Sequence, residues 1–416
     1  MQSQSRISCG ISRQGVLNNI AKYLGNVKTL LAELNFRRAK NWLYGLCAMC
    51  IYSILKIHNM IQIVDFIREY KSIKKEIDSA INRVLRRGVF VLGPEVENFE
   101  KNFAKYCGVK YAVGVASGTD ALYLSLLALD IGRGDEVIVP VNTALATAMA
   151  VKMSGAKPVF CDSDENFLID INKIPALINK RTKAIMPVHL YGRACDMEKL
   201  RALAKAHKLF LIEDCAQAHG AVWNGKKVGG WGDFSCFSFY PTKNLGAYGD
   251  GGAVTTNSEG HYKKLRALRF YGAHDRVTSA MFGINSRLDE KQAAILSVKL
   301  KYLDKWNQKR KNTAKLYGKL ISNKNIILPK VNNENEHVYH LFVARAKNRD
   351  SLMKVLKKKN IQTLIHYPLL LHNQPIFNYK GRFANAEKHS KEIFSLPMHP
   401  FLKKEEVAQI AKILNA

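Results

Sequence analysis

The sequence predicts an α/β protein in which helices cover a mostly parallel β-sheet. From about residue 60 onward, short apolar runs of strand length alternate with helical segments. Of the 416 residues, 47% are hydrophobic, which is enough for a large core. A chain of this length is expected to hold one large domain and a smaller one. We predict a large domain over 60–300 and a small C-terminal α+β domain over 301–416.

The expected helices follow from apolar spacing and from residues that begin or end a helix. Residues 72–87 have helical spacing, with Ser72 placed to begin the helix and Gly88 placed to end it. The run 121–129 is apolar and directly follows a possible capping segment, 117–120. Further helices are expected at 95–106, 197–207 and 352–358, and a long amphipathic stretch at 292–320.

The expected strands are short apolar runs bounded by turn residues. One of them is 136–141, which follows Gly134 and contains Pro140 near its end. Because helical segments separate most of these runs, the strands are expected to be mostly parallel. The full set of expected strands is 111–116, 136–141, 158–161, 184–188, 209–212, 234–239, 252–256 and 340–346.

The first 59 residues differ from the rest of the chain. Their only acidic residue is Glu33, and a basic cluster at 36–40 precedes an apolar run from Trp42 to Ile57. That run is shorter than the roughly 20 residues of a membrane-spanning helix, and it starts too far into the chain for a signal peptide. A mis-called upstream start, an anchoring or amphipathic segment and a helical extension all remain open. We favour the first, because a domain start is expected at Met60.

The charge and the cysteines narrow the class of protein. A formal net charge of +30 suits nucleic acid, an anionic membrane or phosphorylated small molecules. The lysines are spread along the chain rather than gathered in one arm, so nucleic-acid binding is not expected. Of the 8 cysteines, only Cys47 and Cys50 form a CxxC pair, and no second pair or histidine cluster completes a metal site. We therefore expect no metal, and reduced thiols in a cytoplasmic protein.

Two segments that follow expected strands could bind an anion and a ring nitrogen. Residues 117–120 contain Gly118 and Thr119 at a predicted helix N-terminus, where free N–H groups favour a phosphate. An ordinary capped strand–helix turn explains them equally well. Asp214 ends another predicted strand, at the sheet edge where ligands bind. Its carboxylate could keep a pyridinium nitrogen protonated, or it could be a helix cap or a metal ligand.

Two further segments could belong to a site: one contains a lysine, and the other is a polar loop. Lys243 lies in the aromatic and apolar run 237–246, and burial would lower its basicity, as a Schiff-base lysine requires. Ser238 in the same run could donate a hydrogen bond to a phosphate. Most lysines are simply solvated, so Lys243 alone would not decide the matter. Residues 283–290 form a polar loop that opens a helix, and they too could be only a cap.

In this order, the segments resemble the DegT/DnrJ/EryC1/StrS family of sugar aminotransferases. The resemblance runs from about Met60 to the C-terminus and leaves out the first 59 residues. Many motifs in register make a chance match very improbable. They are Leu-Gly-Pro-Glu-Val-Glu at 92–97, Gly-Arg-Gly-Asp-Glu-Val-Ile-Val-Pro at 132–140, Pro-Val-His-Leu-Tyr-Gly at 187–192, Phe-Tyr-Pro-Thr-Lys-Asn-Leu-Gly at 239–246, Gly-Asp-Gly-Gly at 249–252, Asn-Ser-Arg-Leu-Asp at 285–289 and His-Tyr-Pro at 366–368.

The resemblance implies a fold-type I aminotransferase that uses pyridoxal 5′-phosphate and works as a homodimer with two shared active sites. It also implies a role for each matching residue. Lys243 forms the Schiff base with the cofactor and then moves the proton, while Asp214 pairs with the pyridine nitrogen. Gln217 lies near the ring hydroxyl. The remaining roles are phosphate binding by Gly118, Thr119 and Ser238, contact with the partner subunit's phosphate by Asn285, and partner or substrate contacts by His366 and Tyr367.

One position departs from the family pattern. Many members carry an aromatic residue that stacks on the cofactor ring within the segment matching 141–145, and here that position is Ala144. Some relatives also have a small residue there. Ala144 has no aromatic ring that could stack on the cofactor.

The implied reaction is the transfer of an amino group, with glutamate as the expected donor, to a nucleotide-linked keto sugar in amino-sugar biosynthesis. Asn-Ser-Arg at 285–287 resembles members that act on 3-keto sugars, whereas members acting on 4-keto sugars more often have Tyr after the Asn. We therefore expect a dTDP-3-keto-6-deoxyhexose or a related UDP sugar. The alternatives are a 4-keto sugar aminotransferase, a family dehydratase, which Lys243 argues against because dehydratases carry His there, and a regulatory or binding protein without turnover.

Overall fold

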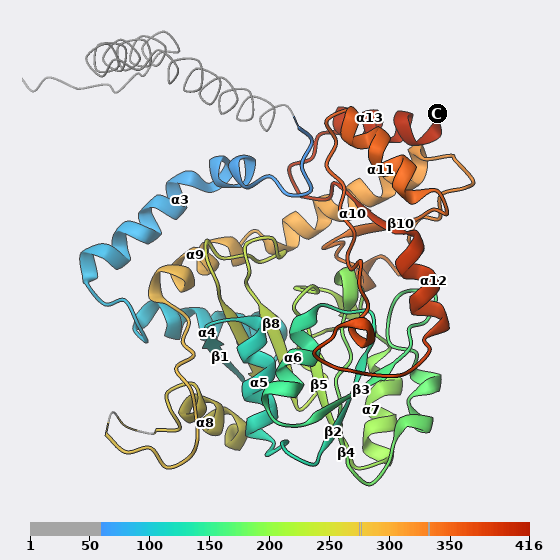
Figure 1. Ribbon diagram of the computed structural model, residues 1–416. Coiled ribbons are helices and arrows are strands. Elements are labelled where there is room, and N and C mark those ends of the chain that lie inside the picture. Colours follow the sequence, from blue (N-terminus) through green and yellow to red (C-terminus); the bar gives the residue numbers. More distant parts are fainter. Residues whose placement is uncertain (1–59, 274, 276, 332) are drawn as a thin grey trace, which may run out of the picture. The chain divides into compact units, whose positions relative to one another are not determined.

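Seven strands form the central sheet of the computed structural model (Figure 1). Their order across the sheet is β1-β9-β8-β5-β4-β2-β3. The strands from β8 to β3 run parallel, while β9 is antiparallel to both of its neighbours. The sheet is therefore mostly parallel, as predicted. The strands are β1 (Tyr111–Val115), β2 (Glu136–Pro140), β3 (Lys157–Cys161), β4 (Thr182–Ile185), β5 (Phe210–Asp214), β8 (Phe234–Ser238) and β9 (Gly252–Thr256).

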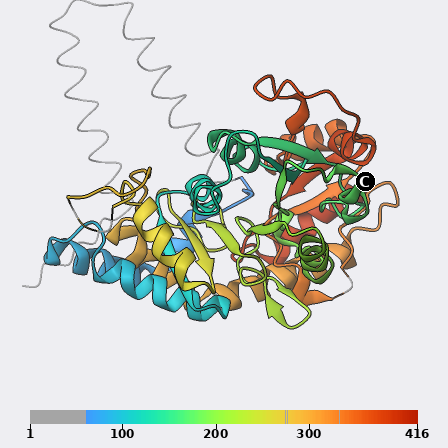
Figure 2. The same cartoon turned by 90° about the horizontal axis from the view of Figure 1, so that it is seen from below.

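Apolar residues fill both faces of the sheet. Along β2, Val137 and Val139 join one buried cluster and Ile138 joins another, because successive side chains of a strand point to opposite faces. Helices lie on both sides of the sheet, as Figure 2 shows. The strands are thus buried on both sides, which explains why they appear in the sequence as continuous apolar runs.

The helices on the two faces come from different parts of the chain. Helices α5, α6 and α8 pack on one face, while α4 and α9 pack on the other, with α7 beside β5. The helices are α3 (Phe66–Arg87), α4 (Pro94–Cys107), α5 (Gly118–Ala128), α6 (Leu145–Met153), α7 (Met197–Ala206), α8 (Glu259–Leu268), α9 (Glu290–Leu300), α10 (Leu303–Leu320), α11 (Arg349–Lys358), α12 (Ala384–Glu392) and α13 (Lys404–Asn415).

One helix prediction needs correction. The first described helix begins at Phe66, because Asp65 accepts a hydrogen bond from the N–H of Arg68 at 2.9 Å and so caps it. Ser72, which was predicted to begin this helix, lies inside it. Gly88 ends the helix with φ at +70°, as predicted. The amphipathic stretch 292–320 forms two helices, α9 and α10.

The C-terminal part has a small sheet and a core of its own. Strands β10 (Phe342–Arg345) and β11 (Ile393–Leu396) pair antiparallel. Their apolar side chains pack with residues of α10, α11 and α13, and Ile61 joins the same cluster. A further two-stranded ribbon is formed by β6 (Val222–Trp223) and β7 (Lys226–Lys227). The division of the chain at residue 300 stays a prediction.

The structure describes residues 60–273, 275, 277–331 and 333–416. By its contacts the chain separates into Met1–Met60 and Ile61–Ala416. The predictions for residues 1–59, including those for the run from Trp42 to Ile57 and for Cys47 and Cys50, lie outside the described residues. In the described part of the chain, no helix combines the length and apolar character needed to cross a bilayer.

Candidate active site

The ends of β5 and β8 bring the two main predicted residues to one edge of the sheet. These strands are parallel neighbours, with Asp214 opposite Cys236. Asp214 is the last residue of β5, and Lys243 lies in the turn beyond β8, which ends at Ser238. The carboxyl ends of parallel strands lie at one edge of an open α/β sheet, where ligands bind. Asp214 and Lys243 therefore share that edge.

Asp214 is a buried carboxylate with two fixed hydrogen bonds. Only 4% of it is exposed. Its Oδ1 accepts from the N–H of Ala216 at 3.1 Å, and its Oδ2 accepts from the hydroxyl of Thr147 at 2.8 Å. Burial raises the pKa of Asp214, and the two hydrogen bonds and the charge of Lys243 oppose this only in part. A cation placed against this carboxylate would be strongly favoured.

Thr147 was not predicted from the sequence as part of the site. It lies on α6, where it is fully buried. The segment around it is rich in Ala, Met and Val, so the sequence gives no sign that this hydroxyl faces a strand end of the sheet. Ala144, the residue that departs from the family pattern, immediately precedes α6.

Lys243 lies in an environment that disfavours its charge. Burial lowers the pKa of Lys243 to about 8, while the Asp214 carboxylate acts in the opposite direction. Part of the Lys243 side chain remains accessible to solvent. A substantial fraction of this amine is therefore neutral near pH 8, which is the form that attacks a carbonyl carbon.

Three histidines lie within the electrostatic influence of Lys243: His219 and His340 are buried, and His366 is half-buried. Burial, together with the charge of Lys243, lowers the pKa of His366 to about 4 and that of His219 to about 3. The pKa of His340 is also lowered well below its ordinary value, first by burial. All three imidazoles are therefore neutral at physiological pH, and they leave Lys243 as the titrating base of this group.

A cradle suited to a phosphate forms where α5 meets the end of β8. Ser117 caps α5 by accepting from the N–H of Asp120 at 3.0 Å. A Cβ on Gly118 would lie 2.5 Å from the Cβ of Ser238, so only glycine lets the helix N-terminus approach the strand this closely. Thr119 lies in the first turn of the same helix. In the described part of the chain, nothing accepts from the N–H groups of Gly118 and Thr119, which leaves them to bind an anion.

Gln217 and Tyr367 are joined by a hydrogen bond that links the large sheet to the C-terminal part. The N–H of Tyr191 donates to Oε1 of Gln217 at 2.7 Å, which fixes the orientation of the amide. The Nε2 of Gln217 then donates to the hydroxyl of Tyr367 at 3.0 Å. Since Tyr367 accepts this bond, its own proton remains for another acceptor. Tyr191 was not predicted as part of the site, and its hydroxyl also donates to the carbonyl of His366.

The structure does not bring Asn285 into this group within one chain. Its side chain is exposed, and the described residues offer it no side-chain hydrogen bond. The neighbouring Ser286 is fully buried and joins this segment to α5, because its hydroxyl donates to Asp120 at 2.7 Å and accepts from Ala116 at 3.0 Å. The predicted role of Asn285 requires a second subunit and stays a prediction.

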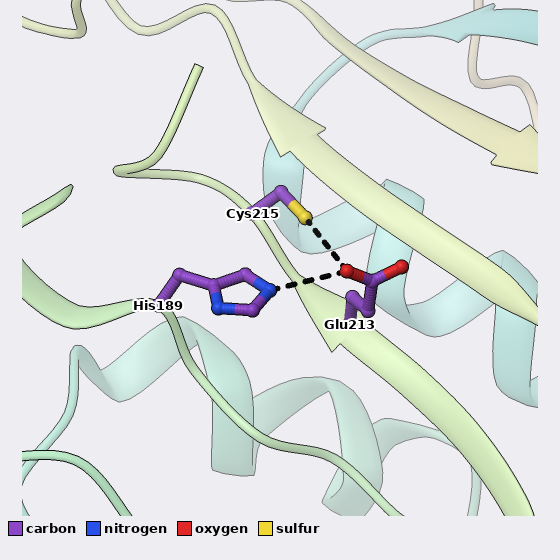
Figure 3. Close-up of side chains that lie close together, drawn as sticks. All are labelled: His189, Glu213 and Cys215. Atoms are coloured by element: carbon purple, nitrogen blue, oxygen red, sulfur yellow. Dashed lines mark hydrogen bonds and ion pairs between the residues drawn. The ribbon is translucent and has the colours of Figure 1, made fainter. Parts of the chain in front are cut away.

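His189, Glu213 and Cys215 form a buried cluster beside the site (Figure 3). The spacing of these side-chain atoms would suit a metal ion, but the atoms that could bind the metal already form hydrogen bonds. Nδ1 of His189 accepts from the N–H of Cys195 at 3.0 Å, so its Nε2 carries the proton and donates to Glu213 at 3.2 Å. Glu213 accepts further hydrogen bonds from Gly229, Trp231, Gly232 and Ser235. The hydrogen bonds of this cluster connect Glu213 of β5 to Ser235 of β8 and to the segments around Cys195 and Gly229.

Known proteins are similar to this chain in sequence and in fold. The model of the DegT/DnrJ/EryC1/StrS aminotransferase family matches residues 71–415. A dTDP-3-amino-3,6-dideoxy-alpha-D-galactopyranose transaminase of Aneurinibacillus thermoaerophilus is 50% identical over 359 residues, which are 86% of this chain and 99% of that protein. The crystal structure of DesV from S. venezuelae in complex with a ketimine intermediate has a TM-score of 0.84 and 41% identity, and the match covers 86% of this chain and 98% of DesV.

A second similar structure contains a cofactor. NtdA from Bacillus subtilis, solved with bound cofactor PMP, has a TM-score of 0.77 and 34% identity, and the match covers 82% of both chains.

Proposed function

The chain belongs to the DegT/DnrJ/EryC1/StrS aminotransferase family, and from this premise we propose that it transfers an amino group to a nucleotide-linked keto sugar with pyridoxal 5′-phosphate held by Lys243. The observation that carries the proposal is that Lys243, a lysine of lowered pKa, and the buried carboxylate of Asp214 lie at the same sheet edge, where the charge of each affects the pKa of the other. These are the two groups that must face opposite ends of a pyridine ring.

The residues at this edge fit the cofactor. The close approach of Gly118 to Ser238 leaves free N–H groups at the N-terminus of α5, which suit a phosphate. Burial raises the pKa of Asp214 because it disfavours the charged carboxylate. A protonated ring nitrogen beside this carboxylate would stabilise its charge. The hydrogen bond from the N–H of Tyr191 fixes the orientation of the Gln217 amide, which we propose lies near the ring hydroxyl. When bound, the cofactor supplies an electron sink for a carbanion.

The protein supplies a mobile base and a fixed frame. In its neutral form, the amine of Lys243 can accept the proton from the α-carbon of the amino donor. The same amine can then deliver that proton to carbon C4′ of the cofactor. Asp214, whose carboxylate accepts hydrogen bonds from Thr147 and Ala216, would hold the proton on the ring nitrogen of a bound cofactor. The neutral histidines near Lys243 add no positive charge that would lower the basicity of the amine further.

For the substrate, we propose a dTDP-3-keto-6-deoxyhexose, or a related UDP sugar, with glutamate as amino donor. Two observations support amination at carbon 3. The similar protein of A. thermoaerophilus is named for a dTDP-3-amino-3,6-dideoxy sugar, and the segment Asn285-Ser286-Arg287 resembles that of members acting on 3-keto sugars. A basic chain, with a net charge of +30, attracts a nucleotide diphosphate. His366 and Tyr367 are the proposed contacts with the sugar or the partner subunit.

We also propose that the protein works as a homodimer. Asn285 is exposed in the single chain, so it is free to reach the phosphate site of a second subunit. The two active sites would then lie at the subunit interface.

Isotope transfer tests the proposed function directly. The protein, supplied with ¹⁵N-glutamate and candidate dTDP- and UDP-keto sugars, should yield a sugar nucleotide that carries the ¹⁵N label in mass spectra. A Lys243→Ala variant should yield none. If no keto sugar gained nitrogen, the reading as a binding or regulatory protein would replace this one, and labelling of 4-keto sugars alone would move the reaction to carbon 4.

A further inference from the structure

Two segments that carry the proposed active-site residues extend beyond the paired strands. Pairing between β5 and β8 ends at Asp214 and Cys236, with one more hydrogen bond from the N–H of Cys215 to the carbonyl of Cys236 at 2.8 Å. Beyond that point, each segment forms its own turn. The N–H of Ala218 donates to Cys215 at 3.0 Å, and the N–H of Lys243 donates to Tyr240 at 2.9 Å. The strand pairing alone does not fix one turn against the other.

One amide side chain on α10 joins the two turns. Asn307 is 4% exposed. Its Oδ1 accepts from Nδ2 of Asn244 at 2.8 Å, and its Nδ2 donates to the carbonyl of His219 at 2.8 Å. Asn244 directly follows Lys243, and His219 belongs to the segment that continues from Asp214 past Gln217.

The orientation of the Asn307 amide is determined by its partners. A carbonyl oxygen can only accept, so Nδ2 of Asn307 must face His219. Nδ2 of Asn244 donates both to Asn307 and to the carbonyl of Val338 at 3.1 Å. Because Asn244 and Asn307 are both buried, loss of this bridge would leave unpaired polar groups without water to replace the lost partners.

Packing around the bridge leaves the His219 segment little room to move toward α10. A Cβ on Gly220 would lie 2.9 Å from Nδ2 of Asn307 and 2.4 Å from the hydroxyl of Tyr106. Gly220 also has φ at +86°, a conformation that other residues rarely adopt. The turn after Asp214 therefore has a defined position against α10.

We infer that Asn307 is a positioning residue, which fixes Lys243 relative to Asp214 by holding Asn244 and the carbonyl of His219 with one amide. This inference rests on the proposed function. Asn307 touches neither cofactor nor substrate in this scheme. It fixes the distance between the amine of Lys243 and the carboxylate of Asp214. Removal of the Asn307 side chain should therefore affect the covalent step at Lys243 more than the binding of the ring and phosphate.

Two ligands separate these effects. Cofactor-free protein is titrated with pyridoxal 5′-phosphate, whose aldehyde reacts with an amine, and with pyridoxine 5′-phosphate, whose alcohol does not. In the Asn307→Leu variant, affinity for the aldehyde should fall about tenfold, as expected for the loss of one or two buried hydrogen bonds. Affinity for the alcohol should change much less, and the rate of covalent trapping at Lys243 should fall.

An exposed asparagine on the same helix provides a matched control. Asn312→Leu changes the same side chain on the surface of α10 and should leave both affinities unchanged. Asn244→Ala removes the bridge from its other end, so it should reproduce the selective loss even if Asn307→Leu does not fold. The double variant should be no worse than Asn307→Leu alone, because both changes remove the same connection.

Two outcomes would overturn the inference. Equal weakening of both ligands in Asn307→Leu would assign Asn307 a general structural role, and unchanged affinity for the aldehyde would assign it none. Failure of the proposed function looks different, because wild-type protein would then bind the aldehyde no better than the alcohol and form no adduct at Lys243. In that case the inference fails with the proposal.

Discussion

Thr147 donates its hydroxyl to Oδ2 of Asp214 at 2.8 Å, which joins α6 to the end of β5. The bond matters because Asp214 is buried and burial raises its pKa. Only the ionised carboxylate can hold a proton on a ring nitrogen by charge. Thr147 thus supports the form of Asp214 that the proposed reaction uses.

Replacing Thr147 by Val should weaken cofactor binding. The substitution keeps the shape of the side chain and removes the hydroxyl, so the pKa of Asp214 should rise further and its pairing with a pyridinium should weaken. We expect about a tenfold loss of affinity for pyridoxal 5′-phosphate, from one hydrogen bond to a charged group. Absorbance titration of cofactor-free protein measures it. Thr147→Ser should retain wild-type affinity, and an equal loss in the serine variant would show that the hydroxyl is not the cause.

The reactivity of Lys243 should follow a pKa near 8. An amine is reactive when it is deprotonated, so the rate of adduct formation should rise with pH and level off above about 8 rather than near 10.4, the value of an ordinary lysine. The rate can be followed in cofactor-free protein by reductive trapping and mass spectrometry of the peptide that contains Lys243.

The Asp214→Asn variant should move this midpoint downward. The carboxylate of Asp214 raises the pKa of Lys243, and its removal leaves burial unopposed. A midpoint that stays in place or moves upward in the variant would mean that the two groups do not interact.

Glu213 should stabilise the fold without a metal ion. Replacing it by Gln places an amide group among donors that need an acceptor, so the free energy of unfolding at pH 7 should fall by about 3 kcal/mol. Burial acts to raise the pKa of Glu213, but hydrogen bonds from His189, Ser235 and Gly229 outweigh burial and hold the pKa below its ordinary value. Its contribution is therefore present above about pH 4.3 and is lost as the pH falls through the lower folded pKa. Denaturant unfolding at several pH values measures the difference, which should shrink in acid.

Two controls accompany this measurement. Glu405→Gln changes an exposed carboxylate at the start of α13 and should leave stability within about 0.5 kcal/mol of wild type. A chelator should not alter the unfolding midpoint of wild-type protein. A large effect of the chelator would show that His189, Glu213 and Cys215 bind a metal after all.

The sequence predicted the central sheet because its strands are buried on both faces. Val137, Ile138 and Val139 form a continuous apolar run for this reason, and the turn residues around such runs mark their ends. The start of α3 was missed, since Phe66 and Ile67 are exposed and contribute no apolar periodicity. Only the bond from Arg68 to Asp65 reveals that the helix begins there.

The site was predicted in part, for a physical reason. Asp214 follows a predicted strand and Lys243 lies within an aromatic and apolar run, but only the resemblance to a family gave each of them a defined role. Sequence reasoning missed three residues whose hydrogen-bond partners are distant in the chain: Thr147, Tyr191 and Asn307. A threonine or asparagine inside a helix shows no sequence pattern that indicates its hydrogen-bond partner. Asn285 cannot be assigned from one chain, because its proposed partner belongs to another subunit.

The most direct measurement of the central claim is the site of the covalent cofactor adduct. Wild-type protein is incubated with pyridoxal 5′-phosphate, reduced with borohydride, which adds hydride to the C=N bond and makes it permanent, and digested for mass spectrometry. We predict one pyridoxyl group per chain, on Lys243, and none on the corresponding peptide of Lys243→Ala. A label spread over other lysines, or placed on a single different one, would contradict the account.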